Sequence, residues 1–281
     1  MALEVGIFLV PDASDHERTV ELAVAADRAG VDVVAIQDHP YQRRFLDTWT
    51  LLSYLGARTE RIRLVPDVLN LPLRLPTVLA KSVASLDLLT GGRVELGIGA
   101  GSFWDAVEAM GGPRRSPGES VDALEEAIGI IRGFLEGERS LRLDGEHYRV
   151  AGAKPGPAPA HSVGIWVGAY RPRMLRLTGR LADGWLPSIG DYLPPENVAD
   201  RHATIDEAAR RAGRDPGDIA RIANIGLGDD PRSWLDPERL ARTSSELRFG
   251  TLLVSVPDSE PLDFIRRLGE EAAPAARELL G

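Results

Sequence analysis

A histidine that could transfer protons stands at the end of a predicted strand. The apolar segment 31–36 predicts this strand, and His39 has the same parity as Val33, Ala35 and Gln37. Because alternate residues of a strand face the same side, His39 is expected to point inward at the strand end. An imidazole there can donate a hydrogen bond to a reduced cofactor or pass a proton near neutral pH. A buried histidine that bonds a backbone carbonyl is the alternative, and spacing alone favours that alternative.

A glycine-rich stretch, LDLLTGGRVELGIGAG at 86–101, is the segment around which the chain is organised. Apolar residues alternate with small or polar ones over 94–99, which predicts a strand that ends at Gly99 and Gly101. Glycines at the outgoing end of a strand let a ligand lie against the backbone. A dinucleotide-binding fingerprint needs its third glycine where the chain has Ser102, so that motif is excluded. Tight turns and close packing are the other interpretation of these glycines.

A candidate phosphate site lies where a predicted helix begins at Pro172. Gly168 and Ala169 end the strand before it. The free backbone N–H groups of a helix start bind phosphate, and Arg171 or Arg173 can add charge-assisted hydrogen bonds. Ordinary N-terminal capping is the alternative.

Arginines cluster in three loops that follow predicted strands. The clusters are Arg43 with Arg44, Arg114 with Arg115, and Arg171 with Arg173. A basic rim on an acidic protein suits a polyanionic ligand. Chance clustering in a chain whose basic residues are mostly arginines is the other explanation.

Strand and helix signals alternate eight times without a break in composition. The predicted strands are 4–10, 31–36, 62–68, 94–98, 164–169, 184–187, 219–227 and 249–256. This alternation predicts an α/β fold, a single (β/α)₈ TIM-type barrel that forms one domain over 1–281. An Asp144-Gly145 turn signal and a proline-rich run predict an insertion hairpin after the fourth strand, within about 138–163. Ser14 and Glu17 have the spacing of a capping box and predict the start of the first helix.

Composition excludes several classes of protein. The chain of 281 residues has no cysteine, and its five histidines are not spaced as metal ligands, so no protein-bound metal is expected. A net charge of −9 argues against a nucleic-acid partner. No apolar run approaches the ~20 residues needed to cross a membrane. We therefore expect a soluble, cytoplasmic protein with no membrane partner.

Three segments resemble the bacterial luciferase-like monooxygenase superfamily, whose members are flavin- or deazaflavin-dependent oxidoreductases on a TIM-type barrel. They are the glycine-rich stretch above, AIQDHPY at 35–41 and IWVGAYRPRMLRLTGRLADGWLPS at 165–188. The resemblance runs from about Val5 to Ser188 and continues more weakly to the C-terminus. It implies an enzyme that acts on a small molecule, and a homodimer.

The resemblance implies roles for particular residues. His39, from the Asp-His pair after the second strand, would reach the cofactor ring, and a non-prolyl cis peptide between Asp67 and Val68 would back it. The residues from Gly168 to Arg173, with Tyr170 among them, would bind the cofactor phosphate. The remaining candidate cofactor contacts are Asn70, Gly99 and Gly101. Taken alone, Asp67 could be a turn former and Asn70 a loop cap. Trp104 could line a substrate pocket or belong to the core.

The preferred function is hydride transfer between coenzyme F-420, a deazaflavin, and a small organic substrate. An FMN-dependent monooxygenase, fed reduced flavin by a separate reductase, is the closest alternative. A barrel that binds flavin without turnover and a phosphosugar enzyme are further alternatives. The sugar-phosphate dehydrogenase branch of the deazaflavin enzymes has an acidic residue where this chain has Ser102, which argues against that activity.

Overall fold

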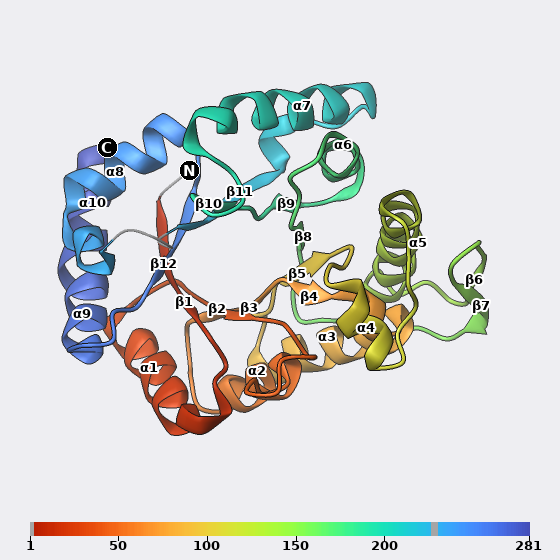
Figure 1. Cartoon of the computed structure of the whole chain (residues 1–281), viewed down its shortest axis with the longest axis horizontal. Coiled ribbons are helices and arrows are strands. Elements are labelled where there is room, and N and C mark those ends of the chain that lie inside the picture. The colour runs from red at the N-terminus through yellow and green to blue at the C-terminus, as the bar shows by residue number, and fades with distance from the viewer. Residues whose placement is uncertain (1–2, 226–229) are drawn as a thin grey trace.

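The parallel strands of the chain close into a barrel in this computed structural model, which describes residues 3–225 and 230–281. The strands are β1 (Glu4–Leu9), β2 (Val33–Gln37), β3 (Arg63–Asp67), β4 (Leu69–Asn70), β5 (Leu96–Gly99), β8 (Ile165–Val167), β9 (Gly184–Trp185), β10 (Ser188–Ile189), β11 (Ala220–Ile225) and β12 (Thr251–Ser255). Their order is β3-β2-β1-β12-β11-β9-β8-β5-β4, with β10 beside β11. They fill eight positions, because β3 and β4 belong to one segment and β9 and β10 to another. The predicted barrel is confirmed (Figure 1).

The barrel closes between β3 and the residues before β5. Leu64 forms a parallel bridge with Val94. The Leu64 N–H donates to the Arg93 carbonyl at 2.8 Å, and the Glu95 N–H donates to the Leu64 carbonyl at 3.1 Å. Gly97 allows this close approach, since a Cβ there would lie 2.0 Å from the Pro66 carbonyl oxygen.

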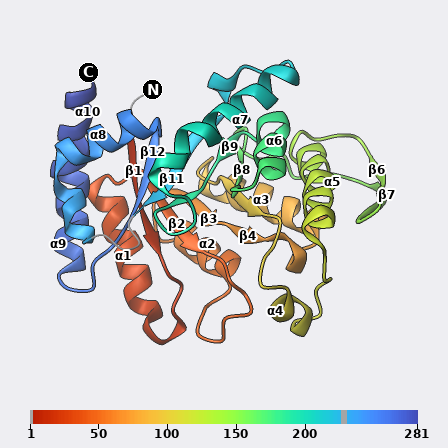
Figure 2. The ribbon, with the colours of Figure 1, turned by 45° about the horizontal axis from the view of Figure 1, so that its top comes forward.

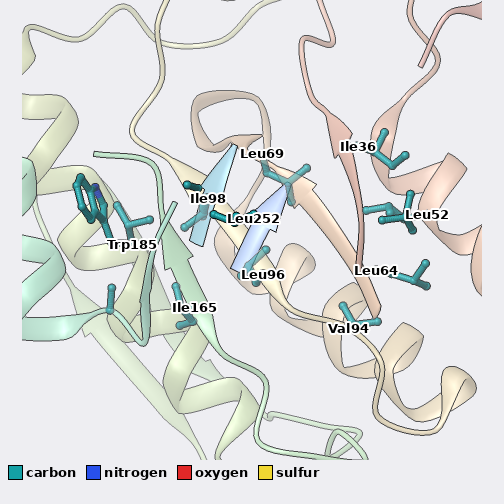
Figure 3. Close-up of a cluster of buried hydrophobic side chains, with 14 of the residues drawn as sticks. Ile36, Leu52, Leu64, Leu69, Val94, Leu96, Ile98, Ile165, Trp185 and Leu252 are labelled. Carbon is teal, nitrogen blue, oxygen red and sulfur yellow. The ribbon is translucent and has the colours of Figure 1, made fainter. Parts of the chain in front are cut away.

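Helices cover the outside of the barrel (Figure 1). They are α1 (His16–Ala29), α2 (Thr48–Gly56), α3 (Pro76–Thr90), α4 (Trp104–Ala109), α5 (Pro117–Leu135), α6 (Pro172–Leu181), α7 (Val198–Arg211), α8 (Pro237–Leu247), α9 (Pro261–Arg267) and α10 (Ala273–Leu280). A π-helical segment, Leu268–Ala272, joins the last two. Outward-facing strand residues such as Leu64, Leu96 and Ile165 pack against these helices in the main core (Figure 3).

The barrel interior is layered. Its middle layer is apolar and consists of Phe8, Val33, Ala35, Val65, Trp166, Leu186, Ile222 and Leu253. Beneath it, at the amino ends of the strands, Arg63 forms ion pairs with Glu4 and Glu95. Strand parity places a second polar layer above it, at the carboxyl ends, which is where barrel enzymes carry their active sites.

A hairpin lies outside the barrel. Strands β6 (Leu141–Asp144) and β7 (Arg149–Ala153) form a separate antiparallel pair beside α5, after the fourth strand–helix unit (Figures 1 and 2). The predicted insertion hairpin is therefore confirmed.

Two sequence-based assignments of elements were wrong or missing. The capping box at Ser14 and Glu17 does not form, because Ser14 instead donates from its backbone N–H and its hydroxyl to Asp12. Helix α1 begins at His16 without a side-chain cap. The sequence analysis names no helix between the last two strands, where the structure has α8, capped by the side chain of Asp236. Positions 226–227 of the predicted seventh strand lie outside the described residues.

Two charged residues of the 86–101 stretch hold the barrel closure in place. Asp87 is fully buried and accepts hydrogen bonds from the backbone N–H groups of Val94, Ala160 and His161 and from the His161 ring. Arg93 is 9% exposed, and its guanidinium donates five hydrogen bonds. Gly91 ends α3 in the left-handed conformation, as its position predicted.

Two searches of the described residues gave negative findings. No helix among them is both long and apolar enough to span a membrane. No group of three or more His, Asp or Glu side chains in residues 3–225 and 230–281 is placed to hold a metal ion.

Candidate functional site

The predicted site residues gather at the carboxyl ends of neighbouring strands. His39 follows β2, Asp67 ends β3, Gly99 ends β5 and Gly168 follows β8. Parallel strands in a closed barrel bring all these ends to one face. We call this face, with the loops that surround it, the mouth.

His39 lies in an aromatic cluster at the mouth. Its Nδ1 is 2.7 Å from the Tyr41 hydroxyl, and its ring meets Phe103 edge to face at 5.6 Å between centroids. Burial raises the pKa of Tyr41 to about 12, against the smaller lowering effect of Ser102. Burial lowers the pKa of His39, despite the opposing effect of the Asp38 charge, so the ring is held toward its neutral form. In the tautomer in which Tyr41 donates to Nδ1, the neutral ring carries its proton on Nε2.

The Asp38 side chain is not part of the aromatic cluster around His39. It is 1% exposed and accepts hydrogen bonds from the Asn70 N–H at 2.8 Å and from Arg74 at 3.0 Å. Arg74 also pairs with Asp47, the N-cap residue of α2. Asp38 thus fixes the segment after β3 to the end of β2. The resemblance gave Asp38 and His39 as a pair, and in the structure only the histidine belongs to the aromatic cluster.

Val68 forms an apolar floor in the mouth. Val68 interrupts the strand between β3 and β4. The Asp67–Val68 peptide bond is cis, as the resemblance implied. A Cβ built on Gly99 or on Gly168 would lie 3.0 Å from the Val68 Cγ2. These two glycines therefore leave room for the valine side chain, which spans the ends of β5 and β8.

Asp67 lies beside this floor and faces across the barrel. The Asn224 side chain, from the end of β11, donates to its Oδ2 at 2.7 Å. Burial raises the pKa of Asp67 to about 7, and the Asn224 hydrogen bond opposes this shift only in part. Asp67 in turn raises the pKa of Tyr170, for which burial is the larger cause.

Gly101 and Trp104 serve local packing. A Cβ on Gly101 would lie 2.5 Å from the Pro72 Cγ and 2.9 Å from the Trp104 ring. The space beside Gly101 is therefore filled by the protein, whereas the space beside Gly99 opens on the Val68 floor. The contact of Gly101 with a cofactor and of Trp104 with a substrate stay predictions.

The start of α6 presents free backbone groups. Its N-cap residue Arg171 makes no side-chain cap bond. Ala169 is buried in the outer core, and its carbonyl accepts from Trp185. The Tyr170 hydroxyl accepts from the Ser188 N–H at 2.9 Å. Arg173 turns away, toward Asp122 and the Gly118 carbonyl of α5, which leaves Arg171 as the charged side chain available at this helix start.

Acidic partners offset part of the arginine charge at the rim. Arg114 pairs with Asp105 and Glu108, and Arg44 pairs with Asp12 at 3.5 Å. Arg115 lies over the Tyr148 ring. The side chains of Arg43 and Arg171 have no hydrogen-bond or ion-pair partner within residues 3–225 and 230–281. The rim is therefore less basic than the arginine count suggested.

Sequence reasoning missed three residues of the mouth, Tyr41, Phe103 and Asn224. Tyr41 stands in the AIQDHPY segment, two residues after His39, and that proximity was an available signal. Asn224 is a polar residue within an apolar strand, which is another signal that could have been followed. Phe103 has a positive φ of 54° as the N-cap residue of α4, a conformation that the sequence does not reveal.

The geometry defines a class of protein before any comparison. A closed parallel barrel with a packed interior and with ionisable residues at its mouth is the architecture of (β/α)₈ enzymes. A model of the luciferase-like monooxygenase family matches residues 3–227. The chain belongs to this family and is an oxidoreductase of it.

Relatives agree with this assignment. The chain is 32% identical to an F-420-dependent glucose-6-phosphate dehydrogenase of Nocardia farcinica, over 84% of this chain and 70% of that one. It is 31% identical to a 5,10-methylenetetrahydromethanopterin reductase of Archaeoglobus fulgidus, over 99% of this chain and 78% of that one. Among solved structures, an F-420-dependent secondary alcohol dehydrogenase superposes with a TM-score of 0.84 at 18% identity, covering 98% of this chain and 99% of that one.

Proposed function

We propose that this oxidoreductase uses coenzyme F-420 to exchange a hydride with a small organic substrate. The observation that carries the proposal is the 32% identity, over 84% of the chain, to an F-420-dependent dehydrogenase. FMN-dependent oxygenation remains the alternative, because the matching family is named for monooxygenases. That alternative would need a reductase as a partner.

The residues of the mouth fit a flat heterocyclic ring. The Val68 floor offers an apolar surface. A residue larger than glycine at position 99 or 168 would crowd the Val68 side chain. Two buried amide oxygens, Asn70 Oδ1 and Asn224 Oδ1, have no hydrogen-bond partner among the described residues. A ring whose edge carries N–H groups would supply the missing donors. The start of α6 with Arg171 would hold the cofactor phosphate.

When bound, F-420 would supply hydride transfer at a carbon of its ring. In the tautomer in which Tyr41 donates to Nδ1, His39 would donate a hydrogen bond from Nε2 into the mouth, held in this orientation by Tyr41. Phe103 packs against the histidine ring and would exclude water from it. The residues of this chain would thus bind the ring, orient it and control protons near it.

Cofactor identity can be tested by equilibrium binding. F-420 carries an anionic oligoglutamate tail that FMN lacks, so F-420 should bind more tightly and lose affinity with added salt. Arg171→Ala should weaken both cofactors about tenfold, through the shared phosphate. The double variant Arg43→Ala, Arg44→Ala should weaken F-420 several-fold and leave FMN unchanged.

The matched control for this titration is Arg139→Ala. Arg139 is exposed and follows the carboxyl end of α5, at the opposite end of the barrel. It should change neither affinity. Tighter binding of FMN than of F-420, or O₂ consumption with reduced FMN, would replace our proposal with the monooxygenase.

We also propose that the enzyme is a homodimer. Exposed apolar side chains gather on α2 and α3, among them Tyr54, Val78 and Leu89, which are 50%, 58% and 84% exposed. A second copy of the chain would cover them. Light scattering after gel filtration should give twice the mass of the chain, and Leu89→Glu should shift it toward the monomer. A monomeric wild type at micromolar concentration would reject the dimer.

A further inference from the structure

The rim of the mouth is lined with aromatic side chains. One group surrounds His39 and comes from the loops after β2 and β5. The ring centroids of Tyr41, Phe45 and Phe103 lie 5.5, 6.3 and 5.6 Å from that of His39. Tyr41 and Phe103 also contact each other, at 5.7 Å between centroids. This group therefore forms one continuous aromatic surface.

A second aromatic pair stands on the loops after β8 and β10. The ring centroids of Tyr170 and Tyr192 lie 5.6 Å apart. Burial is the main cause that raises the pKa of Tyr41, and the charge of Tyr192 adds to this shift. The Tyr41 and Tyr192 hydroxyl groups are thus close enough to interact, although their loops follow different strands. The two aromatic groups therefore border one space.

Two of these rings are exposed. Phe103 is 57% exposed and Tyr192 is 65% exposed. Phe103 also keeps a left-handed backbone conformation with a φ of 54°, which costs a phenylalanine free energy. Large apolar side chains that stay exposed beside an enzyme site indicate a ligand that covers them.

The charged groups beside these rings have opposite signs. Arg43 stands two residues after Tyr41, whereas Asp191 stands directly before Tyr192. Burial raises the pKa of Asp191, and burial lowers the pKa of His39, so both groups are shifted toward their neutral forms. An anionic ligand would meet Asp191 and a cationic one would meet Arg43. An uncharged ligand meets neither repulsion.

We infer that the substrate is an uncharged molecule with a flat unsaturated ring, and that Phe103 and Tyr192 select it by contact with that ring. The substrate would lie on the solvent side of the cofactor, which Val68 supports from below. This inference rests on the proposed function and narrows its small organic substrate to one class. Aryl ketones and the corresponding alcohols are simple members of that class.

Hydride exchange with an aryl ketone is balanced in atoms and electrons. The carbonyl carbon gains a hydride, the C=O π bond breaks, and the oxygen gains a proton. One hydride and one proton are also what the reduced cofactor loses, so no further reagent is needed.

The first test measures binding by calorimetry, with oxidised F-420 present so that no ketone is reduced. Acetophenone and cyclohexyl methyl ketone have the same carbon skeleton, and only acetophenone has a flat ring. Acetophenone should bind about tenfold more tightly, through stacking or edge contacts with two aromatic side chains. Para-acetylbenzoate and para-acetylphenyl trimethylammonium add one negative or one positive charge, and both should bind more weakly than acetophenone.

Matched variants test which rings are responsible. Phe103→Leu and Tyr192→Leu keep an apolar side chain but lose the flat face, so each should weaken acetophenone about fivefold and leave cyclohexyl methyl ketone nearly unchanged. Phe103→Tyr and Tyr192→Phe keep the ring and should bind both ketones as the wild type does. Because both positions are exposed, all four variants should melt close to the wild-type temperature.

A separate assay follows the oxidation of reduced F-420 by acetophenone through absorbance. Absent binding of acetophenone, or equal or tighter binding of cyclohexyl methyl ketone or of a charged probe, would overturn the substrate class. Wild-type selectivity in both leucine variants would overturn the role of Phe103 and Tyr192. Selective binding of acetophenone without any oxidation of reduced F-420 would overturn the proposed function and support the substrate class.

Discussion

Replacing Arg93 with alanine should lower the free energy of unfolding by about 4 kcal/mol or more, because it strips partners from several buried groups at once. Arg93 donates to the carbonyls of Gly56, Thr59, Ile62 and Thr90 and to the Thr59 hydroxyl. Four of these five hydrogen bonds are buried, so their acceptors lose a partner where little water is available to replace it. Chemical denaturation, followed by circular dichroism, would measure the loss.

Two further variants make this stability test specific. Arg93→Lys keeps the charge but has three donors in place of five, so its loss should be intermediate. Arg176→Ala changes an exposed arginine of α6 and should stay within about 0.5 kcal/mol of the wild type. An Arg93→Ala protein within 1 kcal/mol of the wild type would contradict the role of this residue in closing the barrel.

Replacing His39 with alanine should lower turnover by a factor of about 10² to 10⁴, the range of acid–base and hydrogen-bond contributions at a reacting centre. The unfolding free energy should change by less than about 1 kcal/mol, because the ring is half-buried and its hydrogen bond goes to Tyr41 at the mouth. Steady-state kinetics and thermal melting on the same preparation would test both statements. Tyr41→Phe should reduce turnover less than His39→Ala.

The control for His39 is another histidine of this chain. His202 is 1% exposed, bonds the Leu247 carbonyl through Nε2 and packs on Trp185 and Phe249. Burial lowers the pKa of His202 to about 4, so its contribution to stability should be lost as pH falls from about 6.5 toward 4. His202→Ala should unfold more easily and keep the turnover of the folded fraction. If His39→Ala instead behaves like His202→Ala, with normal cofactor affinity, then His39 is structural.

The sequence predicted the barrel well because the signals for it are local. Apolar segments mark strands buried on both faces, and each is followed by a helical pattern and a glycine or proline boundary. Gly91 is an example, since a glycine after a helical segment predicts a left-handed cap without knowledge of any distant residue. The turn at Asp144 and Gly145 is likewise decided by neighbours in the chain.

The site was less predictable because its partners are far apart in the sequence. Asp67 was expected to contact the cofactor, yet its pairing with Asn224, 157 residues later, exists only once the barrel closes. The glycines of the 86–101 stretch drew attention, while Asp87 and Arg93 were overlooked, since their partners lie as far as 74 and 37 residues away. A charged residue in an apolar segment is a sign of such a partner, but it does not say which one.

The apolar layer inside the barrel has a kinetic consequence. Phe8, Trp166 and Leu253 belong to a packed plug between the two polar ends, so the barrel is not a channel. Molecules must enter and leave the mouth from one side. A cofactor seated on Val68 would lie at the closed end of this chamber, and a substrate would stand between it and solvent. A chamber that is open on one side imposes an order of binding: the cofactor, which lies deeper, must bind before the substrate and leave after it.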